Sequence, residues 1–572
     1  MKRMHRVWLS VLCALALVAG PDRAGAAAAK DIALNVLGVY ESGIFNADSI
    51  VGSEVAAYDP ATERLFITNV ADNAIDIVSI ANPASPSKVG TFGLDQWGAS
   101  PNSVDSHDGL IVVAVQADPK TDPGMAVFFD AAGDSEADGF VAAVEVGALP
   151  DMVTFTPNGA MVLVANEGEP DFYGPGNSDP EGSVSIIDVS SPATMTDDDV
   201  ITVGFESFAL NSLDPSIRIF GPGATVAEDM EPEYIAVSHD SRTAWVTLQE
   251  NNAIAELDIR NGVFTRVTGL GFKNHDDAAN KLDASDRDGP GDEHALNIAN
   301  WPILGMYMPD AIAAYRVRGR TYLVTANEGD AREYDHPTDG SFDFAELARI
   351  SSLALNPVQF PAGAATTLLK SADGAGRLEV SRFFANTDGN AADVERLLTL
   401  GARSFSIWSA DGAQVFDSGD QFEQIIAEAD EQDAFGDLDP GGVGDVDFFN
   451  GANDENGSGW DTRSDAKGPE PEGVTVEHIW GRWYAFIALE RVGGVMIYDV
   501  TEPSVPRFVQ YVNRRDFSVD FDIDDPDGDI LDLGAETLFV IPAGDSPTRQ
   551  PLLVVCNEVS GTTTLFAIEK VK

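Results

Sequence analysis

The chain repeats a hydrophobic hairpin seven times, with two short apolar runs of β type joined by a turn in each repeat. An example is EVAAYDPATERLFITN at residues 54–69. Each hairpin begins at a polar residue and ends at another, roughly fifteen positions later, and repetition of several short strands per unit predicts a β-propeller. The flanking pairs are Glu54 and Asn69, Ser103 and Gln116, Asp151 and Glu167, Glu233 and Glu250, Asp310 and Glu328, Glu472 and Glu490, and Glu536 and Glu558.

The polar pairs are predicted to lie on one face of the propeller. In an antiparallel hairpin the start of the first strand and the end of the second strand lie at the same end. The innermost strands surround the central channel, so all seven pairs should crowd one mouth of that channel.

The last repeat has only three strands at the C-terminus, over residues 537–541, 552–556 and 563–568. Residues 32–40 form an isolated β-type run that could supply the fourth strand and remove two exposed sheet edges. We therefore predict an all-β, seven-bladed propeller closed by an N-terminal strand, with an open β-sandwich as the alternative. The predicted domain covers residues 27–572, with acidic loop insertions near 270–308, 331–400 and 420–470 and a helix near 391–400.

The N-terminus resembles a secretory signal peptide. Lys2, Arg3 and Arg6 precede the apolar run 7–20, and small residues allow cleavage after Ala26. We predict a signal peptide at residues 1–26 and a secreted, periplasmic or extracellular mature chain without a transmembrane segment. Cys556 would be the only cysteine left, which excludes an intramolecular disulfide.

The formal net charge of -58, from 93 acidic and 35 basic residues, argues against nucleic acid or an anionic membrane as a partner. Divalent cations are the natural partners of such a chain. A salt-adapted or merely very soluble surface is the alternative explanation for most of the acidic residues.

The carboxylates at the predicted channel mouth are candidate metal ligands, because crowded carboxylates repel one another unless cations or protons compensate them. Hard cations prefer oxygen ligands, so calcium is the predicted cofactor, with magnesium, zinc and manganese as alternatives. The alternative role for these residues is to cap strands and to hydrogen-bond neighbouring blades. The candidate ligands are Asp151, Glu167, Glu233, Glu250, Asp310, Glu328, Glu472, Glu490 and Glu558, with Glu536 in the same ring.

Acidic loops provide further candidates. DASDRDG at residues 283–289 offers Asp283 and Asp288 as ligands, and residues 386–393 and 520–529 are similarly acidic. A solvated acidic turn is the alternative for each loop. Arg287, Arg332 and Arg491 are candidates for binding a phosphate or carboxylate, or for neutralising nearby acids. The chain has no H-E-x-x-H motif and no nucleophile elbow, so no catalytic residue is assigned.

Several motifs resemble the choice-of-anchor I family, which is related to the mesenchyme-specific cell-surface glycoproteins of echinoderm skeleton-forming cells. They are VANEGEP at 164–170, NWPILGMYMPDAIAAY at 300–315, TANEGDAREY at 325–334, KGPEPEGVTV at 467–476 and CNEVSGTTTLFAI at 556–568. The resemblance implies an extracellular or surface-associated β-propeller, and some members are labelled alkaline phosphatase-like. The motifs of alkaline phosphatases themselves are not visible here.

The leading hypothesis is an acidic β-propeller that binds divalent cations and has a binding or surface-organising role. The alternative is a metal-dependent phosphoesterase with its site at the channel mouth, acting on a phosphorylated small molecule. A third hypothesis is a docking platform for a surface protein.

Overall fold

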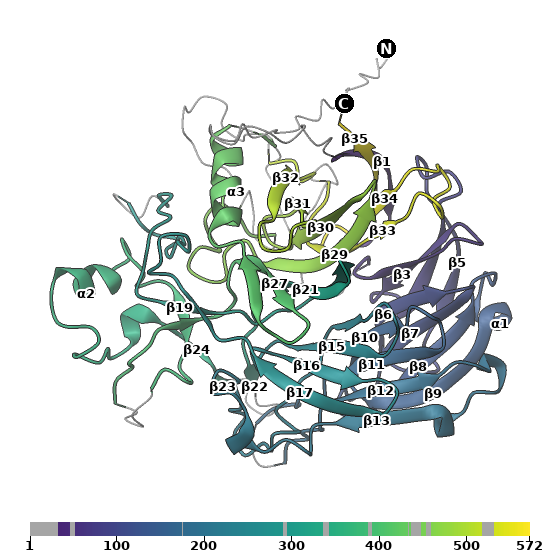
Figure 1. Cartoon of the computed structure of the whole chain (residues 1–572), viewed down its shortest axis with the longest axis horizontal. Coiled ribbons are helices and arrows are strands. Elements are labelled where there is room, and N and C mark those ends of the chain that lie inside the picture. Colours follow the sequence, from purple (N-terminus) through teal and green to yellow (C-terminus); the bar gives the residue numbers. More distant parts are fainter. Residues whose placement is uncertain are drawn as a thin grey trace, which may run out of the picture.

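The computed structural model describes residues 32–571, apart from residues 46–51, 174–175, 290–293, 336–341, 387–391, 433, 436–447, 454–458 and 518–530. The predicted signal peptide at residues 1–26 and the acidic run at 520–529 lie outside the described residues. The described chain is an all-β propeller, as predicted, with a layer of insertions on one side (Figure 1).

The described residues form seven four-stranded antiparallel sheets. The first four sheets follow the chain without interruption. Their strands are β2 (Ala56–Asp59), β3 (Arg64–Asn69), β4 (Ala74–Ser79) and β5 (Ser87–Gly93); β6 (Ser100–His107), β7 (Leu110–Gln116), β8 (Pro123–Asp130) and β9 (Phe140–Ala148); β10 (Pro150–Phe155), β11 (Met161–Asn166), β12 (Ser183–Asp188) and β13 (Val200–Gly204); and β14 (Ile235–Val237), β15 (Thr243–Leu248), β16 (Ala253–Asp258) and β17 (Val263–Gly269).

The fifth sheet is interrupted by an insertion, and the seventh combines both ends of the described chain. In the seventh sheet β1 pairs antiparallel with β35, so a strand from the start of the chain lies beside the last strand. The strands of the last three sheets are β20 (Ile312–Val317), β21 (Arg320–Asn327), β27 (Ser404–Ser409) and β28 (Gln414–Asp417); β29 (Pro471–Ile479), β30 (Arg482–Leu489), β31 (Val495–Asp499) and β32 (Arg507–Val512); and β33 (Ala535–Ile541), β34 (Leu552–Asn557), β35 (Thr562–Lys570) and β1 (Ile32–Glu41).

The middle strands of the sheets are buried on both faces. Successive strand residues point to opposite sides of a sheet, yet Leu65, Phe66 and Ile67 are all fully buried. Phe66 packs in a cluster with Val113 of the second sheet. Leu65 and Ile67 instead pack in a cluster with Val554 of the seventh sheet. The first sheet is thus held between the second and the seventh, which explains why its middle strand reads as a continuous apolar run.

The insertions carry short elements of their own. A three-stranded sheet joins β18, β19 and β26, and a separate apolar cluster includes Leu282, Trp301, Ile350 and Leu378. The elements are β18 (Phe272–Asn274), β19 (Leu304–Met306), β22 (Glu333–Asp335), β23 (Phe342–Ala345), β24 (Leu347–Arg349), β25 (Glu379–Ser381), β26 (Leu398–Thr399), α1 (Glu136–Gly139), α2 (Ala364–Leu369), α3 (Gln421–Glu431) and the 3₁₀ turns Pro192–Thr194, Asp197–Asp199, Leu210–Ser212 and Ile350–Ser352.

The prediction of a helix near residues 391–400 is wrong, because the described residues 392–400 form no helix. Leu398 and Thr399 form a strand that pairs in parallel with Leu304 and Gly305 of β19. Helices occur at α2 and α3 instead. None of the helices that the structure describes has the length and apolar character needed to cross a membrane.

Replacement of Leu34 by alanine tests how much β1 contributes to stability. The Leu34 side chain is buried between the sixth and seventh sheets, so Leu34→Ala is expected to lower the free energy of unfolding by about 2–5 kcal/mol. Urea unfolding followed by tryptophan fluorescence measures the change. Asn35→Ala, at the exposed neighbouring position of the same strand, is the matched control and should have little effect. Equal stability of the two variants would contradict the placement of β1.

Candidate metal centre at the channel mouth

Three glutamates from the third and fourth sheets meet at one point of the channel mouth. Glu167 follows β11, Glu233 precedes β14 and Glu250 follows β15. Each side chain has an oxygen within 4.8 Å of an oxygen of the other two. We call these residues the Glu233 cluster, and they bring together three of the residues predicted as metal ligands.

Three further glutamates from the fifth and sixth sheets form a second group. Glu328 follows β21, Glu472 lies in β29 and Glu490 follows β30. Their oxygens also lie within 4.8 Å of one another. We call these residues the Glu472 cluster. The two clusters use the same hairpin positions, namely the end of one hairpin and the start and end of the next.

Burial makes ionisation of these glutamates costly. Withdrawal from water raises the pKa values of Glu233 and Glu472 well above the usual range, and neighbouring carboxylates raise them further. Withdrawal from water likewise raises the pKa of Glu490 to about 7, although the charge of Arg491 opposes this shift. The unliganded clusters would therefore hold protons at neutral pH, and a cation would compete with those protons.

Some oxygens in the clusters lack a hydrogen-bond partner. Among the described residues, Oε2 of Glu233, of Glu250 and of Glu472 is buried without one. Glu328 differs, because it accepts a hydrogen bond from Nε2 of Gln249 at 3.0 Å and pairs with Lys467. Buried polar groups are normally satisfied, so unpaired carboxylate oxygens that face one another fit a site for a cation.

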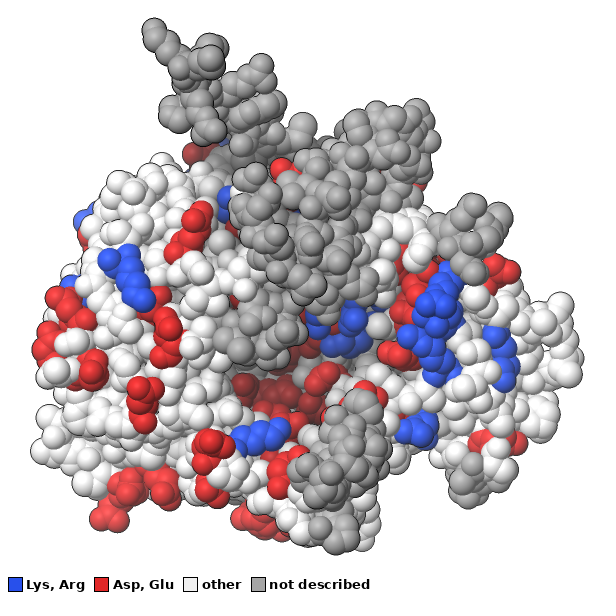
Figure 2. Space-filling view, turned by 180° about the vertical axis from the view of Figure 1, so that it is seen from behind, with Lys and Arg blue, Asp and Glu red and all other residues white. Residues whose placement is uncertain are grey.

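Four further carboxylates of the predicted mouth border one small cavity. Glu54, Asp151, Asp310 and Glu536 border a cavity of about 80 Å³. Burial raises the pKa of Asp151 to about 7 and that of Glu54 to about 8. Figure 2 shows acidic side chains gathered in a hollow near the middle of one face, with lysine and arginine side chains beside it.

Glu558 completes the set of predicted carboxylates. It follows β34, and its backbone N–H donates to the carbonyl of Gly534 at 2.8 Å. Burial raises its pKa to about 8, and the charge of Glu490 adds to the effect. Glu558 therefore lies within electrostatic reach of the Glu472 cluster.

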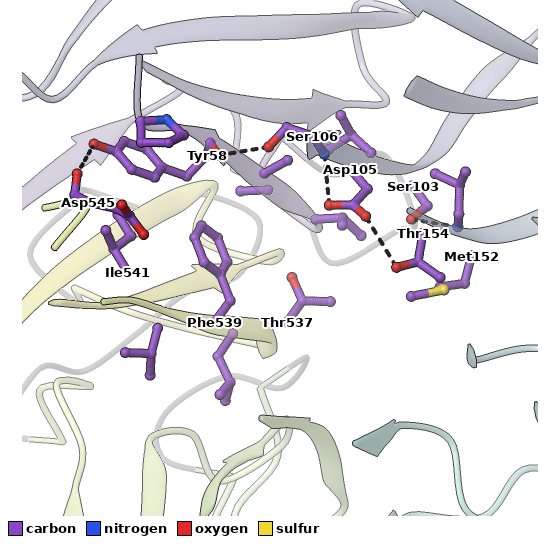
Figure 3. A pocket seen from close by; sticks show the side chains of 18 of the residues that line it. Tyr58, Ser103, Asp105, Ser106, Met152, Thr154, Thr537, Phe539, Ile541 and Asp545 are labelled. Carbon is purple, nitrogen blue, oxygen red and sulfur yellow. Dashed lines mark hydrogen bonds between the residues drawn. The ribbon is translucent and has the colours of Figure 1, made fainter. Parts of the chain in front are cut away.

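A larger cavity of about 320 Å³ is lined by residues farther along the innermost strands (Figure 3). Its carboxylate Asp105 accepts hydrogen bonds from the backbone N–H of Phe155 at 2.7 Å and from Oγ1 of Thr154 at 3.2 Å. The Tyr58 hydroxyl donates to the carbonyl of Asp545 at 3.0 Å. Because these polar groups already have partners, this cavity is a poorer cation site than the acidic mouth.

Basic residues border the Glu472 cluster. Arg463, Lys467 and Arg491 line a cavity of about 210 Å³, which places the predicted substrate-binding residue Arg491 beside the acids. All three basic residues pair with Glu470. Although burial opposes ionisation of Glu470, these charges hold its pKa below the usual range.

The other two predicted substrate-binding arginines lie elsewhere. The buried guanidinium of Arg332 donates to Asp229 at 2.6 Å and to Glu231 at 2.5 Å. Its donors are thus already directed at acids. Arg287 is about half exposed, with Nε at 3.4 Å from Oδ2 of Asp286. Asp283 and Asp288 are buried in the insertion and belong to neither mouth cluster.

Sequence reasoning missed Glu231, Lys467 and Glu470. Glu231 lies two residues before Glu233, and Lys467 and Glu470 begin the motif that contains Glu472. The only sequence signal that could have identified these three residues is therefore their position close in the chain to a predicted ligand. The ion pairs themselves join segments far apart in the chain and were not accessible from spacing.

The choice-of-anchor I domain family matches residues 54–503 of the chain. The chain belongs to this family. The matched range includes both glutamate clusters of this choice-of-anchor I protein and ends before Glu536 and Glu558. Family membership supports an extracellular or surface location and a binding role.

The protein is 32% identical to Gigasin-3a from Magallana gigas over 112 residues, which cover 19% of this chain and 39% of that relative. Similar solved structures include hydrazine synthase of Kuenenia stuttgartiensis, with a TM-score of 0.43, 12% identity and coverage of 93% of this chain and 100% of that one. Another is the Cps50 (Swd1) β-propeller domain of Myceliophteria thermophila, with a TM-score of 0.42, 8% identity and coverage of 94% and 100%.

The stability of the metal-free protein should fall as pH rises. Glu54 and Glu558, with pKa values near 8 in the folded state, bind more protons folded than unfolded. The contribution of these two protonated carboxyls to the free energy of unfolding is fully present below about pH 4, the pKa of carboxyls in the unfolded chain. It is lost as the pH rises towards 8, because the folded protein must then release or retain these protons at a cost. Thermal unfolding in EDTA between pH 5 and pH 8.5 measures this loss.

Glu54→Gln should flatten that pH dependence, because glutamine does not titrate. The control Asp108→Asn alters an almost fully exposed carboxylate and should leave the dependence unchanged. A midpoint that stays constant or rises over the same pH interval in all three proteins would contradict the assigned pKa directions.

Proposed function

We propose that this choice-of-anchor I protein is a secreted, seven-bladed propeller that binds divalent cations, calcium first, at its channel mouth. The observation that carries the proposal is the pair of glutamate triads, in which Glu167 and Glu472 are half-buried and the other four residues are buried, together with the unpaired oxygens of Glu233, Glu250 and Glu472. Carboxylate oxygens are the preferred ligands of calcium, which takes six to eight of them in flexible geometry. Backbone carbonyls and water would complete the coordination.

Ring closure would make the cation sites rigid. In the proposed ring each four-stranded sheet is one blade, and β1 completes the last blade through its pairing with β35. The packing of Leu65 against Val554 supports this arrangement, because it joins the first sheet to the seventh. A closed ring holds ligands from neighbouring blades at fixed separations, which favours binding without rearrangement.

The proposed biological role is cation-dependent binding at a cell surface or outside the cell. The charge of -58 would keep the surface strongly hydrated and would attract cations towards the mouth. The partner would be a surface protein that recognises the cation-loaded mouth. The predicted signal peptide supports export, with the secreted and periplasmic locations as alternatives.

Calorimetric titration of metal-stripped protein with calcium tests this proposal. Saturable binding is expected, and Glu233→Gln combined with Glu250→Gln should remove one class of sites, since amides lack the charge that attracts the cation. Asp108→Asn, at an exposed carboxylate outside both clusters, is the control and should bind as the native protein does. Absence of binding heat and of thermal stabilisation at millimolar calcium would overturn the proposal.

A metal-dependent phosphoesterase is the second candidate function, favoured by the cavity lined by Arg463, Lys467 and Arg491. A cation in the adjoining Glu472 cluster would polarise the phosphate, and the basic side chains would bind its oxygens. Glu470 offsets part of the basic charge, so phosphate binding should depend on the metal.

Hydrolysis of p-nitrophenyl phosphate with added calcium, zinc or manganese tests the second function. Activity should require the metal, and Arg491→Met should raise KM at least tenfold, because an ionic hydrogen bond to phosphate contributes about 1.5–3 kcal/mol. Arg318→Met, at an exposed arginine paired with Glu502, is the control. Activity that survives Glu328→Gln with Glu490→Gln would remove this site from the reaction, and inactivity with every metal would exclude the function.

A further inference from the structure

In the Glu472 cluster, both carboxylate oxygens of Glu328 are already engaged by other side chains. Oε1 pairs with the ammonium of Lys467, and Oε2 accepts a hydrogen bond from Nε2 of Gln249 at 3.0 Å. Whichever of these oxygens a metal ion used, one of the two partners would have to move. The ammonium is the stronger competitor, because it brings a positive charge to a buried carboxylate.

The backbone around Lys467 holds the ammonium in this position. Lys467 lies in the loop before β29, and only 15% of its side chain is exposed. The backbone N–H groups of Ala466 and Gly468 both donate to the carbonyl of Arg463, at 3.1 and 2.9 Å, so the residues on either side of Lys467 are fixed. Nζ also lies 3.1 Å from Oε2 of Glu470. Lys467 is therefore a built-in cation beside the Glu472 cluster.

The Glu233 cluster has no counterpart of Lys467. Oε2 of Glu233 and Oε2 of Glu250 are buried without a hydrogen-bond partner, and no member of the cluster forms an ion pair with a lysine or arginine within the described part of the chain. The guanidinium groups of Arg218 and Arg332 lie near this cluster, but both pair with other acids. The negative charge of the Glu233 cluster is therefore left for an external cation.

We propose that Lys467 excludes calcium from the Glu472 cluster and so determines which of the two clusters takes the cation. This inference rests on the calcium binding proposed above, and it assigns the tight site to the Glu233 cluster. Calcium in the Glu472 cluster would have to displace the ammonium from Glu328, because both cations need the same carboxylate. The displaced ammonium would move into the adjoining cavity of about 210 Å³, which Lys467 also lines.

Calorimetric titration of metal-stripped native protein and of Lys467→Met with calcium tests this inference. The native protein should show one tight site and one weak site. In Lys467→Met the weak site should tighten about tenfold or more, because the competing charge-assisted hydrogen bond to Glu328 is lost. A variant that is merely damaged would lose affinity, so a gain distinguishes this role of Lys467 from a purely structural one.

Further variants assign each site to its cluster. Glu472→Gln with Glu490→Gln, added to Lys467→Met, should remove the newly tightened site and leave the other one. Glu233→Gln with Glu250→Gln, added to Lys467→Met, should do the reverse.

Lys120→Met is the matched control, because Lys120 pairs with Glu169, a glutamate outside both clusters, and it should keep the native affinities. Lys467→Arg retains the positive charge and should retain the weak site. If Lys467→Met does not fold, Lys467→Gln takes its place, since its amide can still donate to Glu328 and only the charge is lost.

Two sites of equal affinity in the native protein, or a weak site that both Lys467→Met and Lys467→Gln leave unchanged, would overturn the inference. A native protein that binds no calcium, beside a Lys467→Met variant that binds one ion, would refute the function proposed for the channel mouth and support the exclusion by Lys467. Calcium binding by none of these proteins would refute both.

Discussion

The structure depends on the compensation of carboxylates that the fold removes from water. Burial of an ionised carboxylate is costly unless a partner or a proton compensates it. The protein meets this constraint in part around Arg332, where one guanidinium donates to both Asp229 and Glu231, although Oε1 of Glu231 is buried without a hydrogen-bond partner among the described residues. It does not do so at Glu233 and Glu250, whose Oε2 atoms are buried and unpaired within the described chain. The channel mouth must therefore take up protons or cations, and this requirement links stability, pH and cation concentration.

Residues 459–470 connect the mouth to the insertion. Within this segment burial and then the charges of Asp283 and Asp288, from the insertion, raise the pKa of Asp461. Lys467 of the same segment pairs with Glu328 of the Glu472 cluster. Arg403 holds the segment from outside by donating to the carbonyls of Ser464 and Ala466 at 2.8 and 2.9 Å. A change in charge at either end therefore acts on a short, hydrogen-bonded piece of backbone, which provides a direct physical connection between the two regions.

The sequence was sufficient to predict the propeller and the gathering of carboxylates at one mouth, because both follow from a hairpin that is repeated along the chain with polar residues at its two ends. A short continuous apolar run such as residues 65–67, bounded by turn residues, predicts a buried strand without tertiary information. The helix expected near 391–400 failed because tertiary packing overrode local spacing. Leu397 and Leu398 are adjacent yet pack in two different apolar clusters, which suits an extended segment whose successive side chains point to opposite sides.

The division of the ring into two triads was not predictable, because it depends on small offsets between blades. Likewise, the approach of Asp461 to Asp283 depends on how two insertions pack. Period and spacing describe one hairpin or one loop, and they contain no information about the distance between loops. The sequence therefore identified the residue types of the sites, while their partners came from tertiary structure.

The two triads differ in the charge that surrounds them, and this difference bears on what each can do. The Glu472 cluster adjoins Lys467 and Arg491, so a cation there would lie beside groups that bind anions. The Glu233 cluster is formed by carboxylates alone. Two buried guanidinium groups near it are already engaged: that of Arg332 donates to Asp229 and Glu231, and that of Arg218 donates to the backbone carbonyl of Glu250 and pairs with Glu346. An anionic ligand would thus be attracted to the Glu472 side, whereas the Glu233 side favours the cation itself. One acidic mouth can in this way combine a retained cation with a second position open to a negatively charged partner.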